Sequence, residues 1–339
     1  MKKAIIVFLL FSVLAVSAFA QVSFSGSAYA GIQFLNPVGD GETITTDHRE
    51  EGAPRFDFSA TVLRENFGAR LDTTFRMTEG ADIDALVLNG IYGWVDFDDL
   101  LGNDLLRFTM GQISSTPWVL PRLHISHAEV EFGDVRGLRI DYTTPIQGLS
   151  AGAALRADGH GFQRSFERMV FGLTYNHHMF SAIFAYDLSA NGQAIFGFNY
   201  TGILDLTAGF QLRAGHLASW SDDLFPGTLQ LRQIVAYRVM RPLNVFLVAS
   251  QSVENRYESD VGLEFIPGVE YRILPNLVGS FSAIIESPDH FSTTNLTLNP
   301  MIEKTLRGPA ILYFDYQLRF DDMDTVTHTI GFGITIRAF

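Results

Sequence analysis

The sequence predicts an all-β protein, a transmembrane antiparallel β-barrel of 16 to 18 strands, and three observations support this prediction. Apolar and polar residues alternate with a period of two, in segment after segment, from residue 22 to the end. Short and long connections alternate between these segments, and the first twenty residues have the character of an export signal. A barrel with an apolar outer face and a polar inner face accounts for all three.

The first segment, MKKAIIVFLLFSVLAVSAFA, combines a charged pair, an apolar run and a small-x-small cleavage motif at Ala18-Phe19-Ala20. It predicts a cleaved signal peptide over residues 1–20 and a mature barrel over residues 21–339. The alternative is an uncleaved membrane anchor, for which the apolar run is short. The segment therefore predicts export.

The composition excludes several classes of protein. The chain of 339 residues has no cysteine, which excludes disulfide scaffolds, thiol nucleophiles and cysteine-based metal centres. After residue 20 no segment reaches the roughly 20 unbroken apolar residues of a membrane helix. The net charge of −13 makes nucleic acid an unsuitable partner. Because no phosphate-binding or dinucleotide-binding motif is present, no cofactor is predicted.

The alternation is clearest in residues 69–77, ARLDTTFRM, where Ala69, Leu71 and Phe75 oppose charged and hydroxyl side chains. It continues to the C-terminus, residues 327–339, where isoleucines and Phe332 share one face. This last strand is expected to close the barrel against the strand that begins at Val22. The terminal Phe339 falls in phase with the polar face instead, which differs from the usual outer-membrane pattern.

The connections between strands give the strand count. Short ones lie near 65–66, 100–104, 145–148, 176–178, 201–202, 240–243, 274–276 and 306–308. Longer ones lie near 36–53, 78–84, 115–135, 157–166, 187–192, 214–227, 252–260, 286–292 and 320–325. Eight short and nine long connections join eighteen strands, with both chain ends on the side of the short turns. The short turns are expected to be periplasmic and the long loops external.

A soluble β-sandwich or β-solenoid would need a second layer to cover the apolar faces. The sequence offers no amphipathic helix for that purpose, and the polar faces carry charged residues that would not form a dry core. Lipid covers the apolar face of a barrel in the bacterial outer membrane, which is the predicted location. With 16 to 18 strands, the interior is expected to be an aqueous pore.

One long connection, residues 115–135, is predicted to fold into the pore as a constriction loop, with Trp118 and Phe132 as aromatic anchors. The candidate loop residues are Arg122, Glu129, Glu131 and Asp134, and the candidate wall residues are Arg70, Asp72, Arg76, Arg107 and Arg139. Loop carboxylates facing wall arginines would set a transverse field, and fixed charges of this kind are how pores select solutes. Alternatively, the arginines pair within the wall with Asp57, Asp72 and Asp141.

Residues 92–112, YGWVDFDDLLGNDLLRFTMGQ, resemble the strands before the constriction loop of general diffusion porins from Gram-negative outer membranes. The element EFGD at 131–134 and the hairpin at 136–157 are similar to the next parts of that family. The resemblance implies trimeric barrels, passive diffusion, loop acids at Glu131 and Asp134, and wall bases at Arg70, Arg76 and Arg107. The loop is shorter than that family's usual one.

Catalytic and metal sites are not predicted. His124, His127 and Glu129 could form a metal-binding cluster, but their spacing is loose. Neither His160 with Asp158 nor His328 with Asp324 accompanies a nucleophile motif, so the chain is not expected to be an enzyme.

The predicted function is a porin, a water-filled channel for passive diffusion of ions and small hydrophilic solutes. One alternative is a surface-exposed adhesin or structural barrel, supported by loop 36–53. Another is a substrate-specific transporter; its inward aromatic candidates are Tyr29, Tyr92, Trp94 and Tyr313. The sign of ion selectivity is open, since acidic loops at 39–52, 219–223, 253–260 and 321–324 oppose the wall arginines in charge.

Overall fold

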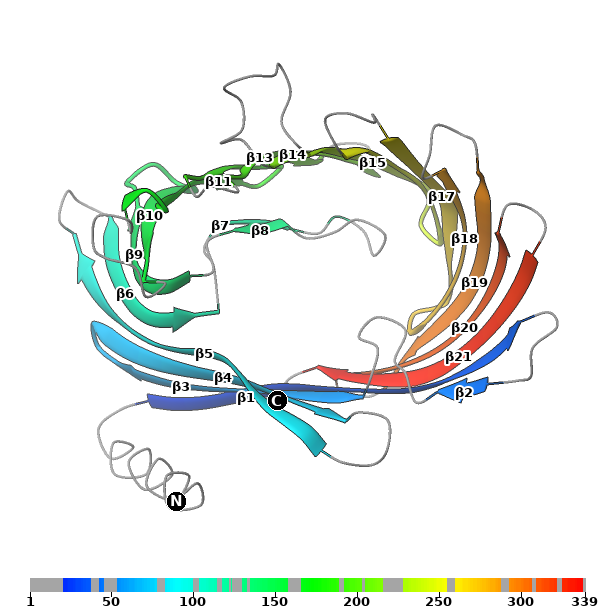
Figure 1. The fold of residues 1–339 in the computed structure, drawn as a ribbon, viewed down its shortest axis with the longest axis horizontal. Helices are drawn as coiled ribbons and strands as arrows, with labels where there is room; N and C mark the ends of the chain where they lie inside the picture. Colours follow the sequence, from blue (N-terminus) through cyan, green and yellow to red (C-terminus); the bar gives the residue numbers. More distant parts are fainter. Residues whose placement is uncertain are drawn as a thin grey trace.

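A computed structural model shows a closed antiparallel barrel (Figure 1). It describes residues 21–37, 43–45, 54–77, 83–99, 104–114, 118–121, 123, 130–132, 135–157, 166–188, 192–202, 205–215, 228–254, 260–287, 293–306, 309–321 and 325–337. None of these residues belongs to a helix that is long and apolar enough to cross a membrane.

Within this part of the chain, 18 strands form the barrel wall. The first nine are β1 (Gln21–Pro37), β3 (Arg55–Arg64), β4 (Phe67–Met77), β5 (Ile83–Asp98), β6 (Leu105–Ile113), β9 (Val135–Thr143), β10 (Leu149–Arg156), β11 (Val170–His177) and β12 (Phe180–Asp187). The other nine are β13 (Ala194–Thr201), β14 (Leu206–Gly215), β15 (Thr228–Met240), β16 (Leu243–Glu254), β17 (Asp260–Leu274), β18 (Leu277–Ser287), β19 (Asn295–Thr305), β20 (Ala310–Asp321) and β21 (Thr325–Arg337).

Three short strands are not part of the barrel wall. They are β2 (Thr43–Thr45), which pairs with β1, and β7 (Trp118–Leu120) and β8 (Val130–Phe132), which pair with each other. β7 and β8 lie inside the barrel, beside β11 to β13 (Figure 1). The predicted strand count of eighteen is confirmed.

The barrel closes through β1, whose two halves serve different neighbours. Residues 21–29 pair with β3, and residues 27–37 pair with β21. The offset between the two pairings is the stagger that a tilted, closed barrel requires. Closure of β21 on β1 confirms the predicted partner of the last strand, and it leaves no free sheet edge at this seam. The phase of Phe339 lies outside the described residues.

The short connections fall where the sequence predicts them, and several contain residues in the left-handed backbone region. Glu65 has φ 42°, Asp99 φ 57° and Asp205 φ 57°, each in a tight turn between antiparallel strands. Gly148 has φ 83° in the turn between β9 and β10, where the absence of a side chain removes the steric cost. These turns alternate with the longer connections around the barrel.

The outer face of the wall is apolar and rich in aromatic rings. Phe314 and Phe332 have ring centroids 4.9 Å apart, and Phe332 contacts Phe34 across the barrel seam at 6.3 Å. Phe332 is 48% exposed although it is fully apolar. A continuous band of such residues would promote aggregation in water, whereas lipid solvates it in a membrane barrel.

In one sector, the inner face is apolar rather than polar. Val170, Ile183 and Ile195 point inward from β11, β12 and β13, and each is at most 2% exposed. They are dry because β7 covers them. The predicted polar inner face is therefore not found in this sector, because the apolar residues Trp118 and Leu120 of the loop pack against apolar wall residues here.

Candidate functional site: the constriction loop

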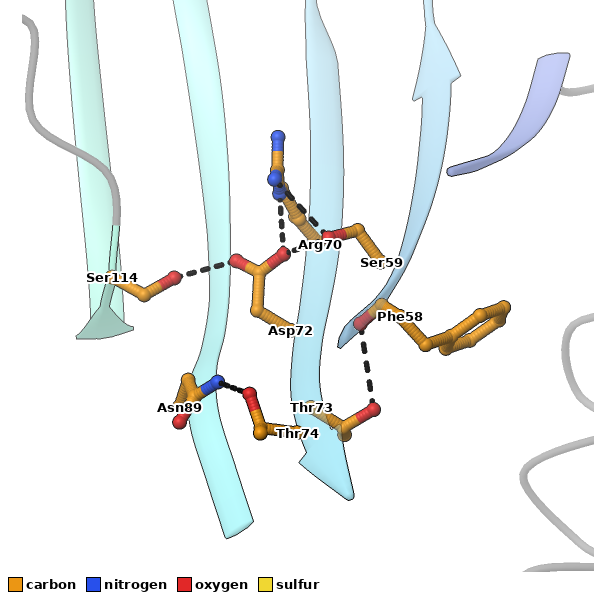
Figure 2. A network of polar contacts seen from close by, with 8 residues as sticks. All are labelled: Phe58, Ser59, Arg70, Asp72, Thr73, Thr74, Asn89 and Ser114. Carbon is orange, nitrogen blue, oxygen red and sulfur yellow. Dashed lines mark hydrogen bonds and ion pairs between the residues drawn. The ribbon is translucent and has the colours of Figure 1, made fainter. Parts of the chain in front are cut away.

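The constriction loop leaves the wall at Ser114, directly after β6. The Ser114 hydroxyl donates a hydrogen bond of 2.5 Å to Asp72 on β4, reaching past β5 (Figure 2). Gly90 on β5 makes this reach feasible, because a Cβ at that position would lie 2.3 Å from the Ser114 Oγ. The start of the loop is thus fixed to the wall two strands away.

Asp72 is the centre of a buried polar network (Figure 2). Besides Ser114, its carboxylate accepts hydrogen bonds from the Ser59 hydroxyl at 2.6 Å and from the Arg70 Nε at 2.8 Å. The residue is only 8% exposed. A buried carboxylate is tolerated where several donors satisfy it, and these three donors fix its position.

Trp118 is the main anchor of the loop. It is fully buried, and its indole ring lies on two glycines of neighbouring strands, Gly172 on β11 and Gly152 on β10. A Cβ at Gly172 would lie 2.1 Å from a ring carbon, and one at Gly152 would lie 2.8 Å from the ring. Only glycine allows the ring to sit this close to the wall backbone.

Two leucines continue the same packing around the barrel. Leu120 lies over Gly197 on β13, and Leu123 lies over Gly209 on β14. Between them, the Asn199 amide donates a hydrogen bond of 2.6 Å to the Pro121 carbonyl. The described residues of this segment are Ser114, 118–121 and Leu123, and we call them the strap. They contact the inner wall from β4 to β14, in part over inward-facing glycines. We call Gly152, Gly172, Gly197 and Gly209 the glycine floor.

The strap completes a dry cluster inside the barrel. Its members are Tyr92, Ile113, Trp118, Leu120, Val135, Ala154, Val170, Ile183 and Ile195, with Trp94 packed against them. Burial of this apolar surface holds the loop in one position, at roughly 25 cal/mol for each Å² removed from water. The described part of the loop around Trp118 and Leu120 is packed against the wall.

The candidate wall arginines form short ion pairs with neighbouring aspartates. Arg70 contacts Asp72 at 2.8 Å. Arg107 makes two hydrogen bonds to Asp96, at 2.6 and 2.8 Å, and its guanidinium lies 5.3 Å from the centroid of the Trp94 ring. This two-pronged geometry holds the guanidinium plane in one orientation.

Arg139 does not occupy the position expected of a pore-lining base. It pairs with Asp141 at 2.9 Å and is only 4% exposed, so solutes do not reach it. Arg76 lies on the same face of β4 as Arg70 and Asp72 and is exposed. The alternative of ion pairs within the wall therefore describes Arg70 and Arg139, while Arg107 uses Asp96, a partner that the sequence analysis did not consider.

The predicted loop charges fall mostly outside the described residues. This holds for Arg122, Glu129 and Asp134, whereas Glu131 belongs to β8, where it is opposite Val119. The loop starts beside Asp72 on β4, but β7 lies against β11 to β13, a different sector from the arginines of β4. That loop acids face the wall arginines stays a prediction.

Ser114, Asn199 and the glycine floor were not predicted from the sequence. A signal for the glycines is nevertheless present in the strands. Three of them stand at an inward position beside an outward phenylalanine, as in Phe171-Gly172, Phe196-Gly197 and Gly209-Phe210. A glycine that interrupts the inner pattern of a strand marks close approach of another chain segment. The pattern does not identify which chain segment approaches the glycines.

Comparison with known proteins identifies the fold. No family model matches the sequence, and no curated protein matches it. The outer-membrane channel DcaP of Acinetobacter baumannii is similar in structure, with a TM-score of 0.53 at 12% identity over 95% of this chain and 98% of that one. OccK11 (OpdR) of Pseudomonas aeruginosa gives a TM-score of 0.57 at 10% identity, over 94% of this chain and 96% of that one.

A mutant porin of Rhodopseudomonas blastica gives a TM-score of 0.51 at 8% identity, over 94% of this chain and 100% of that one. At such low identities the likeness concerns the fold, and it extends over nearly the whole of each chain. The chain has the closed-barrel fold of bacterial porins and outer-membrane channels.

Proposed function

We propose that the protein is an outer-membrane porin that lets ions and small hydrophilic solutes diffuse passively through its barrel. The observation that carries this proposal is the strap, whose described residues pack against one sector of the inner wall of an 18-strand barrel. A barrel of this size encloses an aqueous lumen unless something fills it. The strap narrows such a lumen at a fixed level and supports size selection.

The ion pairs of the wall suit this function. Arg70 and Arg107 are partly exposed and are held in fixed orientations by their largely buried partners, Asp72 and Asp96, so none of them needs to move when a solute passes. Charges held in this way select by sign and size without an energy source. We propose no catalytic role, and the similar solved structures are channels and porins.

Planar-bilayer recording of the purified protein tests the proposal. We expect discrete, ohmic conductance steps, and liposomes containing the protein should swell in solutions of small sugars but not of large oligosaccharides. Absence of steps from correctly folded protein, judged by its β-sheet circular dichroism, would contradict it. The adhesin alternative has its best support in loop 36–53, most of which lies outside the described residues.

A specific transporter would be favoured by a continuous aromatic path along the lumen. Tyr92 and Trp94 lie 6.0 Å apart, but both belong to the dry cluster under the strap. Tyr313 is on β20, where it packs over Gly333. Among the described residues these rings serve packing at separate places and form no such path.

We also propose export through a signal peptide over residues 1–20, insertion in outer-membrane lipid, and a homotrimer. Within the described residues, β5 from Ile83 to Gly90 pairs with β4 alone, because β6 ends at Ile113. The Gln112 side-chain amide donates to the Leu88 and Asn89 carbonyls of this segment. Its exposed apolar side chains, Val87 and Leu88, support a contact with a second copy. N-terminal sequencing should give Gln21 as the first residue, and cross-linking in detergent should give a trimer and no larger species.

A further inference from the structure

A polar recess lies on the inner wall formed by β15 to β20. Its volume is ≈ 480 Å³, within the range of small-molecule sites. It is lined by Gln230, Arg232, Ser250, Ser252, Gly262, Leu263, Glu264, Glu286, Ser287, Asn295 and Arg319. Leu123 of the strap packs against a cluster on β15 to β17, formed by Ile234, Phe246, Val248 and Ile266, but no described strap residue lines the recess. The recess continues the inner wall beyond the strap (Figure 1). We call it the β15–β20 pocket.

The strand register arranges its charges in a line. Arg232 on β15 is opposite Ser250 on β16, and Ser250 is opposite Glu264 on β17. Glu264 is opposite Glu286 on β18, which is opposite Asn295 on β19. Two carboxylates therefore stand side by side on neighbouring strands, an arrangement that costs free energy unless positive charge lies nearby.

The side-chain contacts show which positive groups and hydrogen-bond donors of the protein lie near Glu264 and Glu286. Glu264 accepts a hydrogen bond of 2.9 Å from the Ser250 hydroxyl, while the Arg232 Nη2 stays 3.9 Å away, which is too long for a hydrogen bond. Glu286 interacts electrostatically with Arg319, but no described residue donates a hydrogen bond to its carboxylate. The Arg319 Nε itself donates to Asp321 at 2.6 Å.

We propose that the β15–β20 pocket binds small zwitterionic solutes of the α-amino-acid class as they pass through the channel, an inference that rests on the proposed porin function. The ammonium group would lie between Glu264 and Glu286 and donate to both. The carboxylate, attached to the same carbon, would lie toward Arg232. An ammonium has three donors and a carboxylate accepts from a guanidinium fork, so both charges of the solute are matched.

The pocket discriminates against simpler ions. Arg232 and Arg319 repel a cation that lacks a carboxylate, and the two glutamates repel an anion that lacks an ammonium. A neutral diol could also form hydrogen bonds to these charged side chains. It brings no charge of its own, whereas the zwitterion adds an opposite charge at both ends and therefore binds more strongly.

Single-channel recording with glycine as the probe tests this proposal. Glycine carries no net charge at neutral pH, so any interruption of the current reports binding rather than altered conductivity. We expect concentration-dependent interruptions with glycine, and much weaker ones with ethylene glycol, ethylammonium or acetate. Glu286→Gln should weaken the glycine effect about tenfold, because it removes a charge-assisted hydrogen bond. Glu264→Gln provides a second variant in case the first does not fold.

Glu270→Gln is the matched control. Glu270 lies on the inner face of the same strand as Glu264, roughly 20 Å away at about 3.3 Å per residue, and does not line the pocket. This variant should keep the wild-type response to glycine. Equal interruption by glycine and ethylene glycol, or by glycine and ethylammonium, would overturn the proposal. So would a glycine response that survives both pocket substitutions in folded protein.

The two proposals fail separately. A protein without conductance steps would refute the porin function itself. A conducting protein that does not distinguish glycine from the control solutes would refute only the amino-acid pocket.

Discussion

At the scale of single residues, the constriction depends on glycines, which have no side chain to block the approach of the strap. Trp118 can be fully buried only because Gly172 and Gly152 offer backbone without a side chain beneath the ring. In soluble cores, the loss of a buried tryptophan side chain costs about 3–5 kcal/mol. A stabilisation of similar size holds the strap against the wall, so small changes in the glycine floor should shift the position of the strap.

Gly172→Ala should unseat the loop. The new Cβ would lie 2.1 Å from the Trp118 ring, which is rigid and has no free space around it. We expect noisier and larger single-channel steps, with the barrel still folded. Gly93→Ala is the control, since its Cβ meets only the Gly68 carbonyl at 3.4 Å. Identical recordings from the two variants would show that the ring does not depend on Gly172.

Arg107→Ala should shift ion selectivity toward cations. It removes one positive charge and leaves Asp96, whose side chain is 12% exposed, without that bidentate partner. The reversal potential in a salt gradient measures the shift. The double variant Arg107→Ala with Asp96→Ala removes both charges and should return the potential toward the wild-type value. An unchanged potential in the single variant would place this pair away from the conducting path.

At the scale of elements, the strap and the β11–β13 sector form one packed unit. Val170, Ile183 and Ile195 are apolar residues on the inner face of a water-filled barrel, which is acceptable only while β7 covers them. The inner face of these strands and the loop therefore depend on each other. A change in either one exposes apolar surface in the other.

Replacing residues 118–132 by a short glycine-serine linker should widen the pore. We expect a larger unit conductance and passage of larger sugars in liposome swelling. The variant should also unfold at a lower temperature, because three apolar wall residues become exposed to water. Restoring the polarity of the wall with Val170→Thr and Ile183→Thr in the same variant should recover part of that loss. Unchanged conductance would mean that the strap does not narrow the lumen.

At the scale of the whole molecule, charge should govern selectivity. The chain has 24 basic and 37 acidic side chains, and arginines such as Arg55, Arg70 and Arg107 are already paired with aspartates. An excess of acidic over basic side chains attracts cations, and salt screens the effect over about 10 Å at 0.1 M. We expect weak cation selectivity that declines as salt rises. A reversal potential of the anion-selective sign at low salt would contradict this.

Much of the fold can be read from the sequence, because the rules involved are local. A period of two decides which side chains share a face of a strand, and turn residues mark where each strand ends. Residues 69–77 thus predict the exposed Phe75 and the inward Arg70 and Asp72 of β4. The count of eighteen strands and the closure of β21 on β1 follow from the same alternation.

Only the tertiary structure decides which inner residues meet. Ser114 and Asp72 are 42 positions apart, and Asn199 and Pro121 are 78 apart, so no local pattern links them. The burial of Arg139 and the partnership of Arg107 with Asp96 depend on strand register and on where the loop lies. By itself, the sequence determined a barrel with an apolar outside, since alternation is a property of one strand. The structure decided which parts of the inner wall are covered by the strap and which carry exposed charges, because packing depends on strands that are distant in the sequence.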